Sequence, residues 1–356
     1  MPENKFHLLI NTEFEHNESP ELYFERIQKL KTISNVRIVD ILTDDEISWE
    51  TKKLPKWLSN NKPDLLHMPT NRICLNTLIP QVATFHDCME WKFIKKIHAI
   101  PNNANFRLKL YVLKKRFYVW LIYKWGLRKA KHVTTISNFA QKSLFEEFSF
   151  LRRKSSFVYH GIPNNYKVDP EFSSFENRYG VLMLGGDSYQ KNPENAIKAW
   201  SLLPETVRKS NPLIIAGFTG NETSPISKTI KELGLTEHIV IKNWVAEDEL
   251  VKLFQRSKLL MFVSREEGFG FPLTQALACG TPVVTSTAEV LLEIGQNACN
   301  AAPAEDPIAI SEVLLSLLNS NENWRNKHEI SIKRSRAFDW KITTQHIKNI
   351  YEQQLS

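Results

Sequence analysis

Cysteine is scarce in this sequence. The four cysteines form no Cys-x-x-Cys pair, show no metal-ligand spacing and lie among apolar or small residues: Cys74, Cys88, Cys279 and Cys299. We therefore expect reduced, buried thiols rather than disulfides or a cysteine metal site.

Long apolar runs are also missing. No window reaches the roughly 18 uncharged apolar residues of a transmembrane helix, and the N-terminal residues 1–5 lack the apolar region of a signal peptide. With 42% hydrophobic and 24% charged residues, the composition is that of a soluble globular protein. We expect a cytoplasmic protein, and a chain of 356 residues suits two domains.

Acidic residues are absent from positions 91–131, although the chain as a whole carries both signs and a net charge of +7. Lysines and arginines alternate there with Trp, Tyr and Phe. Three interpretations are open: a solvated helical face, a nucleic-acid surface, for which no motif speaks, and a surface that docks on an anionic membrane. We favour the membrane, because lysines beside aromatic side chains suit its interface, and we expect no nucleic-acid partner.

Short β-rich runs alternate with helical stretches throughout the chain. This order predicts an α/β protein with two doubly wound parallel sheets. The strands are expected within 5–11, 35–42, 63–68, 81–87, 131–137, 155–166, 180–186, 212–218, 238–245, 258–264 and 281–286, and helices near 193–203, 225–234, 247–256 and 272–279.

The domain boundaries follow from composition. We expect an N-terminal domain over 1–167, a polar, proline-containing linker over 168–179 and a C-terminal domain over 180–335. Residues 336–356 read as an amphipathic helix with Asp339 as its cap, which we expect to pack back on the N-terminal domain.

Glycine is also scarce, yet two glycines stand together after the strand that ends at Ser264, in "SREEGFGFPLTQALACGTPVV". Gly268 and Gly270 let the backbone approach a ligand closely, and Pro272 fits the first turn of a helix. The N–H groups of residues 271–274 would then form an anion site. A plain strand-to-helix turn with solvated carboxylates is the alternative.

The full stretch resembles the signature E-G-F-G-x-P-x-x-E-A-x-A-x-G-x-P-V of glycosyltransferase family four, the retaining GT-B enzymes. The resemblance implies the GT-B fold, with two Rossmann-like domains facing across a cleft. One position departs from the signature, because Gln275 stands where the family has its second glutamate. That glutamate holds the ribose hydroxyls, and a neutral amide would weaken the grip by about 1 kcal/mol.

The resemblance extends to other segments and implies a role for each. Lys191 would bind the donor diphosphate after a glycine turn at Gly186, with Gln190 in place of the family's arginine, for which Arg265 could compensate. Trp244 would lie against the base. The implied donor-binding residues are Lys191, Gly186, Trp244, Gly268, Phe269, Gly270, Phe271, Thr274 and Gln275.

Catalytic roles are implied for Glu267, which would hold the sugar hydroxyls, and for His86, which would face the reacting sugar. His86 and Asp87 match a strand ending in "T-x-H-D", although such a histidine could equally be a core residue. Ser137 and Asp87 would line the cleft on the acceptor side. The family's glycine-rich loop after the first strand is missing, and we interpret the acidic "TDDE" at 43–46 as a turn rather than a metal motif.

The implied function is a metal-independent, retaining hexosyltransferase without a cofactor. It would move mannose or another sugar from a GDP- or UDP-linked donor to a glycan or lipid-linked acceptor. Bacterial surface-polysaccharide or lipopolysaccharide synthesis, at the inner face of the membrane, is the implied setting. Two alternatives remain: another GT-B enzyme such as a sugar-nucleotide epimerase, and a non-catalytic sugar-nucleotide or membrane-binding relative.

Overall fold

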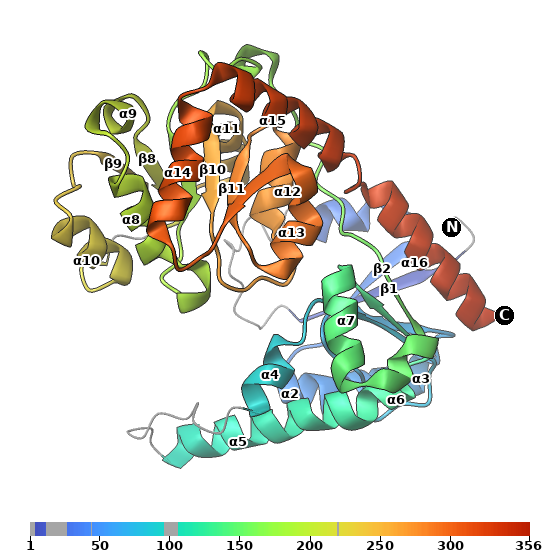
Figure 1. Ribbon diagram of the computed structural model, residues 1–356. Coiled ribbons are helices and arrows are strands. Elements are labelled where there is room, and N and C mark those ends of the chain that lie inside the picture. The colour runs from blue at the N-terminus through green and yellow to red at the C-terminus, as the bar shows by residue number, and fades with distance from the viewer. Residues whose placement is uncertain (1–3, 12–26, 44, 96–105, 219–220) are drawn as a thin grey trace. The chain divides into compact units, whose positions relative to one another are not determined.

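The computed structural model describes residues 4–11, 27–43, 45–95, 106–218 and 221–356 (Figure 1). By its internal contacts the chain divides into two compact units. Unit 1 comprises Met1–Thr134, Leu151–Lys154 and Ile350–Ser356, and unit 2 comprises Thr135–Phe150 and Ser155–Asn349.

The strands of the first half form two sheets. One is a parallel pair, β1 (Phe6–Ile10) and β2 (Val36–Asp40). The other has four strands in the order β3 (Leu66–Met68), β4 (Gln81–Phe85), β5 (His132–Thr135) and β6 (Ser155–Phe157). Every residue of β4 is buried, including the polar Gln81 and Thr84. All six lie within the predicted segments.

The helices of unit 1 follow these strands. They are α2 (Glu46–Ser48), η1 (Trp49–Lys53), α3 (Leu54–Asn61), α4 (Met89–Lys95), α5 (Phe106–Leu121), η3 (Ile122–Gly126) and α6 (Leu127–Lys129). The predicted turn at 43–46 extends one residue too far, because α2 begins at Glu46. The Asp45 side chain caps this helix by accepting from the Ser48 N–H at 2.7 Å, which gives it a local structural role.

Unit 2 contains a six-stranded sheet in the order β12-β11-β10-β7-β8-β9, and every neighbouring pair is parallel. Its strands are β7 (Val181–Leu184), β8 (Leu213–Ala216), β9 (Ile239–Lys242), β10 (Leu259–Phe262), β11 (Val283–Ser286) and β12 (Cys299–Ala302). Five of them were predicted, and β12 was not. The chain order reverses between β7 and β10, the point where α/β sheets of this kind bind ligands.

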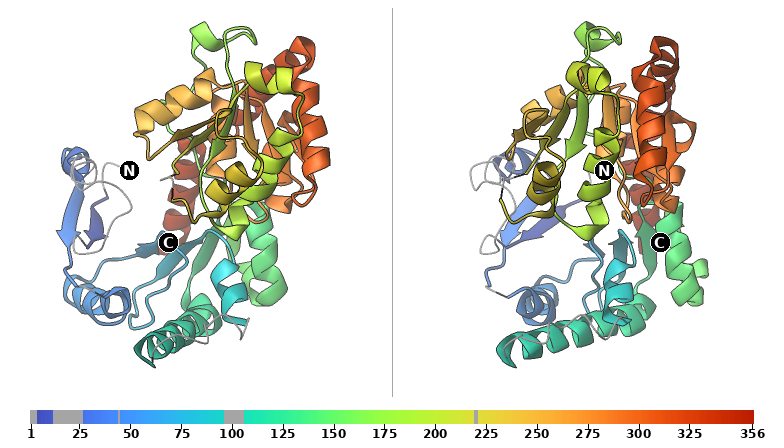
Figure 2. Two further views of the ribbon diagram at one scale, coloured as in Figure 1. Left: turned by 90° about the vertical axis from the view of Figure 1, so that its left-hand side faces the viewer. Right: turned by 60° about the vertical axis from the view of Figure 1, so that its left-hand side comes forward.

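Helices cover both faces of this sheet (Figures 1 and 2). Leu259 and Met261 of β10 pack in one core, whereas Leu260 and Phe262 pack in the other, because successive strand residues point to opposite faces. One core includes α8 (Pro193–Ser201), α10 (Pro225–Glu232), α14 (Pro307–Leu318) and α15 (Asn321–Ser335); the other includes α11 (Glu247–Arg256), α12 (Phe271–Ala278) and α13 (Glu289–Gly295).

The remaining elements of the chain are short, apart from two helices. They are α7 (Asn138–Glu147), η4 (Ser149–Arg153), η5 (Pro170–Phe172), η6 (Tyr189–Lys191), α9 (Glu205–Ser210), η7 (Gln296–Ala298) and α16 (Trp340–Leu355). Asp339 accepts a hydrogen bond from the Lys341 N–H at 2.8 Å, so the predicted cap of the last helix is confirmed.

The predicted linker at 168–179 is part of unit 2, where it is held by Arg178, a side chain that is 2% exposed. Its guanidinium donates to the carbonyls of Cys279 and Phe172 and to the Thr281 hydroxyl, at 2.6 to 2.8 Å. All four cysteines are free thiols, and three are buried, Cys299 being intermediate. Within the described residues, no helix has the length and apolar character needed to cross a bilayer.

Candidate functional site

Two loops of unit 2 meet where β7 and β10 end. These strands are adjacent and parallel, so their carboxyl ends open on the same edge of the sheet. Gly185 and Gly186 follow β7, and the segment from Ser264 to Gly270 follows β10. The backbone N–H of Arg265 donates to the Gln190 carbonyl at 2.8 Å, which ties the two loops together.

The start of α12 has the backbone form that the sequence predicts. Gly270 precedes the helix with φ of 93°, a conformation that favours glycine, and an added Cβ would lie 2.8 Å from Leu291. No side chain caps this helix. The N–H groups of Leu273 and Thr274 donate to the Gly270 carbonyl, and Pro272 has no N–H. Of the four residues predicted to form the anion site, 271–274, the backbone N–H of Phe271 is therefore the one left to bind an anion.

Lys191 and Glu267 lie together at this edge. The Lys191 Nζ is 2.8 Å from the Glu267 Oε1, and the side chains are 41% and 11% exposed. Lys191 ends η6, and the next residue, Asn192, is fully buried, with its amide donating to the carbonyls of Val263 and Ala304. The turn that presents Lys191 is thus fixed to the end of β10.

Arg265 has other partners than the one suggested from the sequence. Its guanidinium forms a bidentate pair with Glu305 and donates to the Tyr189 carbonyl at 2.7 Å. The hydrogen bond with Glu305 raises the pKa of Arg265. Its positive charge is therefore already paired, and Arg265 holds the η6 turn in place.

The other residues predicted to bind the donor differ in how close they lie to the Lys191–Glu267 pair and in how exposed they are. A Cβ at Gly186 would contact the Lys191 side chain at 3.4 Å. Thr274 is buried, with its hydroxyl donating to the Phe271 carbonyl at 2.9 Å, and Gln275 is half-buried one residue later. Trp244 follows β9 and is 60% exposed. Among the described residues, no hydrogen bond or ring interaction joins it to Lys191 or Glu267.

An aromatic cluster beneath the turn is a feature that the sequence did not predict. Phe269 is buried against the rings of Tyr159, His160 and Phe338, with centroids 6.0 to 6.2 Å away. Phe271 packs against the same histidine at 5.6 Å, with the two rings nearly parallel. These rings fix the backbone between Gly268 and Phe271.

Ser137 is fully buried, and its hydroxyl accepts from the Ala140 N–H at 3.0 Å. The hydroxyl therefore caps α7. The Glu293 carboxylate occupies the same helix end, because it accepts from the Asn138 and Phe139 N–H groups at 2.8 and 2.6 Å. The acceptor role expected for Ser137 stays a prediction.

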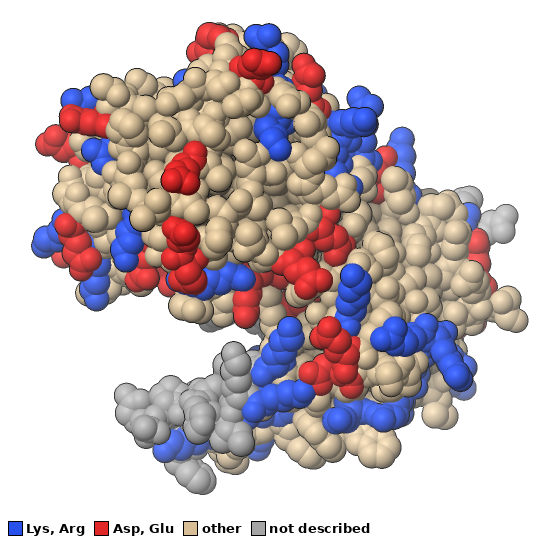
Figure 3. Space-filling model, viewed as in Figure 1, with Lys and Arg blue, Asp and Glu red and all other residues tan. Residues whose placement is uncertain are grey.

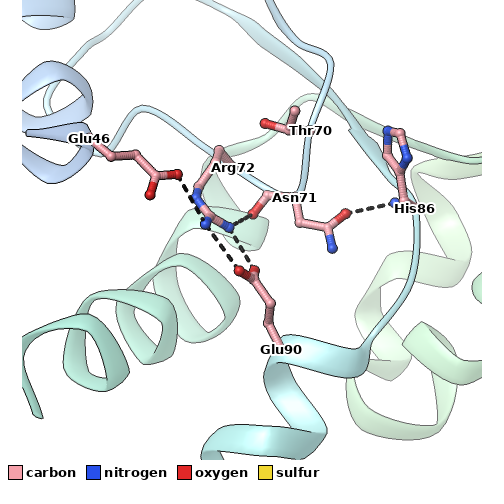
Figure 4. A pocket seen from close by; sticks show the side chains of 6 residues that line it. All are labelled: Glu46, Thr70, Asn71, Arg72, His86 and Glu90. Carbon is pink, nitrogen blue, oxygen red and sulfur yellow. Dashed lines mark hydrogen bonds and ion pairs between the residues drawn. The ribbon is translucent and has the colours of Figure 1, made fainter. Parts of the chain in front are cut away.

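His86 and Asp87 of unit 1 lie after β4, as predicted. The His86 backbone N–H donates to the Asn71 Oδ1 at 2.7 Å, and its ring Nε2 lies 2.9 Å from the Pro69 carbonyl. Asp87 accepts from the Met89 N–H at 2.8 Å and so supports the start of α4. Figure 4 shows His86 at one side of a cavity of about 310 Å³.

The rest of this cavity was missed from the sequence. It is lined by Glu46, Thr70, Asn71, Arg72, His86 and Glu90. Arg72 is at its centre and binds Glu90 with both terminal nitrogens, at 2.6 and 3.0 Å (Figure 4). A polar "PTNR" run directly after β3 is the signal that could have indicated it, since ligand-binding residues gather after strand ends.

Glu50 is not among the lining residues of this cavity but lies next to Arg72, and it is 6% exposed. Its carboxylate is 3.4 Å from the Arg72 Nε and accepts from the Tyr118 hydroxyl. Burial raises the pKa of Glu50 to about 7, although the hydrogen bond from Tyr118 and the charge of Arg72 oppose this change. The carboxyl group is therefore partly protonated near neutral pH.

Two family models match the chain in succession. Residues 16–165 match the model described as Glycosyltransferase Family 4, and residues 167–336 match Glycosyl transferases group 1. The chain belongs to glycosyltransferase family four. The predicted family and the GT-B fold are thereby confirmed.

Curated relatives match at moderate identity. The chain is 27% identical to O-antigen chain mannosyltransferase B of Escherichia coli over 240 residues, which are 64% of this chain and 62% of that protein. It is 25% identical to the O-antigen chain mannosyltransferase RfbU of Salmonella typhimurium over 51% of this chain and 49% of that one. The matches thus span less than two thirds of these relatives.

Solved structures resemble the whole chain. A glycosyltransferase from Rickettsia africae matches with a TM-score of 0.70 and 15% identity over 99% of both chains. HepE of Anabaena, solved with UDP-glucose, matches with a TM-score of 0.68 and 16% identity over 98% of this chain and 99% of that one. At this identity the likeness shows the fold.

Proposed function

We propose that this protein is a retaining glycosyltransferase that moves a hexose from a nucleotide-sugar donor to a glycan or lipid-linked acceptor. The observation that carries the proposal is the Lys191–Glu267 pair, with 2.8 Å between Nζ and Oε1, beside the uncapped start of α12. A cation and a free helix N–H suit a diphosphate, and a carboxylate suits sugar hydroxyls. Family membership supports the same roles.

The proposed donor is GDP-mannose or a UDP-linked hexose. The names of the curated relatives, two of which are O-antigen chain mannosyltransferases, favour mannose and surface-polysaccharide or lipopolysaccharide synthesis. The UDP and UDP-glucose complexes of HepE favour a uridine nucleotide. Trp244, 60% exposed after β9, is the proposed contact of the base.

The proposed reaction depends on neutralising the departing diphosphate. The bond from the sugar C1 to the phosphate oxygen breaks, and a bond from C1 to the acceptor oxygen forms on the same face. The acceptor proton passes to the leaving phosphate oxygen. Lys191 and the Phe271 amide stabilise the charge that develops on this oxygen, without a metal ion in the proposal. Glu267 holds the sugar hydroxyls, and His86 is proposed to face the reacting sugar.

The first test identifies the nucleotide and then removes Glu267. UDP, GDP, ADP and their sugar conjugates are screened by thermal shift, because a ligand bound to the native state raises the melting temperature. With the donor that binds, Glu267→Ala should abolish sugar release and transfer. Glu266→Ala, an exposed neighbouring carboxylate, is the matched control and should retain both.

Three results would contradict the proposal. Sugar transfer that survives in Glu267→Ala would remove this residue from the reaction. A nucleotide sugar that is isomerised without any acceptor would favour an epimerase, and failure to bind any nucleotide would favour a non-catalytic relative.

We further propose that α5 docks on an anionic membrane surface. Four apolar residues spaced three or four apart form one stripe of this helix and are 39% to 61% exposed: Leu110, Leu113, Phe117 and Trp120. The rings of Phe117 and Trp120 lie parallel at 6.0 Å. Lys109 and Lys114 are exposed beside the stripe, and basic side chains gather over α4, α5 and α6 (Figure 3).

This arrangement fits a membrane better than a solvated face. An exposed apolar stripe with basic flanks inserts between lipid headgroups while lysines attract anionic lipids. On a helix face that is only solvated, a stacked pair of Phe and Trp rings would leave apolar surface exposed to water. Residues 96–105 of the predicted basic segment lie outside the described residues.

A further inference from the structure

The cavity of unit 1 has the size and lining of a small binding site. Its volume of about 310 Å³ lies at the lower end of the range for ligand sites and suits one sugar ring. Hydroxyl, amide, imidazole, guanidinium and carboxylate groups line it, from Thr70, Asn71, His86, Arg72, Glu46 and Glu90. Such a lining suits a ligand that both donates and accepts hydrogen bonds.

The guanidinium of Arg72 is already occupied by acidic partners. Besides the bidentate pair with Glu90, it lies 3.4 Å from Glu46 and 3.4 Å from Glu50. A phosphate or carboxylate ligand would therefore meet carboxylates rather than an available cation, and like charges repel at short range in a partly buried site. This cavity disfavours an anionic ligand.

The charges in and next to the cavity nearly balance. Arg72 and Lys115, whose Nζ is 3.8 Å from Glu46, offset Glu46 and Glu90. Glu50, the third carboxyl group on Arg72, is partly protonated near neutral pH because burial raises its pKa to about 7. A balanced, hydrogen-bonding cavity suits a neutral polar ligand.

Glu46 is the carboxylate best able to receive a ligand. Its side chain is 46% exposed, and its interactions with Arg72 and Lys115 are long, at 3.4 and 3.8 Å. Figure 4 shows it extending from α2 toward the guanidinium. Its oxygens can thus accept hydrogen bonds from hydroxyl groups, whereas the Glu90 carboxylate is held by Arg72.

We propose that this cavity binds a neutral pyranose of the acceptor glycan, with the Glu46 carboxylate accepting hydrogen bonds from its hydroxyls and with phosphorylated sugars excluded. The assignment of the sugar to the acceptor rests on the proposed function. The sugar binding itself does not, because it needs neither donor nor catalysis.

Binding is tested with the whole protein by saturation-transfer NMR. The probes are the methyl α-glycosides of mannose, glucose, galactose and N-acetylglucosamine, and the 6-phosphates of mannose and glucose as anionic counterparts. At least one neutral glycoside should bind, and the sugar phosphates should bind at least about tenfold more weakly. Glu46→Ala should weaken binding of the neutral glycoside about tenfold or more, because the hydrogen-bond acceptor is lost. Glu46→Gln should weaken it several-fold, because a neutral acceptor replaces a charged one.

Asp64→Asn is the matched control, since Asp64 is an exposed carboxylate of unit 1 outside the cavity. It should bind the glycosides like the unmodified protein. The circular-dichroism spectra and melting temperatures of Glu46→Ala and Glu46→Gln should match those of the unmodified protein, which shows that both variants are folded.

The possible failures are distinguishable. Glycosides that do not bind, that bind equally to Glu46→Ala, or that bind no better than their phosphates overturn the sugar site, even if nucleotide sugars are turned over. Glycosides that bind through Glu46 while no nucleotide binds leave the sugar site in place and remove the transferase proposal.

Discussion

The ammonium group of Lys191 and the carboxylate of Glu267 neutralise each other across 2.8 Å at the end of β10. These are the residues proposed to bind the donor's diphosphate and its sugar. A bound diphosphate would compete with Glu267 for the same cation. Removing Lys191 would therefore both delete a phosphate contact and leave the Glu267 charge facing the anion.

Lys191→Gln should weaken nucleotide diphosphate binding about tenfold or more, since a charge-assisted hydrogen bond contributes about 1.5 to 3 kcal/mol. Titration calorimetry with UDP and GDP measures this loss. The double variant Lys191→Gln/Glu267→Gln should recover part of it, because the repulsive charge is gone. Lys209→Gln, which removes a similar pair with Glu205 at 2.7 Å, is the control. Equal affinities in all variants would place the diphosphate elsewhere.

Gln275→Glu should tighten the donor nucleotide several-fold. A carboxylate accepts hydrogen bonds from the ribose hydroxyls more strongly than an amide, by about 1 kcal/mol. The gain should shrink with 2′-deoxyUDP or 2′-deoxyGDP, which lack one of these hydroxyls. Unchanged or weaker binding of the ribonucleotide by Gln275→Glu would mean that this residue does not reach the ribose.

Replacing the apolar stripe of α5 should release the protein from anionic vesicles. Phe117→Ser/Trp120→Ser should lower the fraction of protein that floats with phosphatidylglycerol vesicles. Lys114→Gln should lower it less, because one lysine contributes about 1 kcal/mol to the free energy of membrane binding. High salt should weaken binding of the unmodified protein. Leu233→Ser/Leu292→Ser removes exposed apolar residues of unit 2 and is the control. Equal binding to neutral phosphatidylcholine vesicles would argue against an electrostatic component.

Glu50→Gln should change how stability depends on pH. The native state holds the Glu50 proton more tightly than the unfolded chain, since burial raises its pKa from 4.5 to about 7. This contribution to stability is fully present below pH 4.5 and is lost as the pH rises through about 7. The variant has no proton to lose. We therefore compare the two free energies of unfolding at each pH. The value for Glu50→Gln minus the value for the unmodified protein should rise by roughly 1 to 3 kcal/mol between about pH 5 and pH 8.

Urea denaturation of both proteins across this range measures the difference. His67 of the same unit titrates in both, and burial lowers its pKa to about 4, so its own effect cancels in the comparison. A difference in stability that stays constant with pH would show that Glu50 has an ordinary pKa.

The sequence predicted the parallel strands of unit 2 well because their apolar runs are short and bounded by turns. β10 and β11 are buried at every position and lie within the predicted segments. β12 was missed, since its residues, Cys299 to Ala302, are small or polar and partly exposed. α14 was missed too, although Asp306 caps it and Pro307 begins it, both signals that a sequence can show.

The two sites differ in how far local sequence could predict them. Lys191 and Glu267 each follow a strand end, so the order of elements indicates that they approach one another. Arg72 instead gathers glutamates from positions 46, 50 and 90. Each is an ordinary charged residue in its own segment, and tertiary packing of unit 1 brings them together.

Because the strands of the six-stranded sheet are all parallel, their carboxyl ends form one edge, which carries the proposed donor site. Their amino ends form the opposite edge, which is available for modification. The loop at 233–238 leads into the amino end of β9, opposite the edge where Lys191 and Glu267 lie. Thr236 and Glu237 of this loop are exposed. Fluorophores or affinity tags inserted at this loop can therefore report on the protein without touching the donor site.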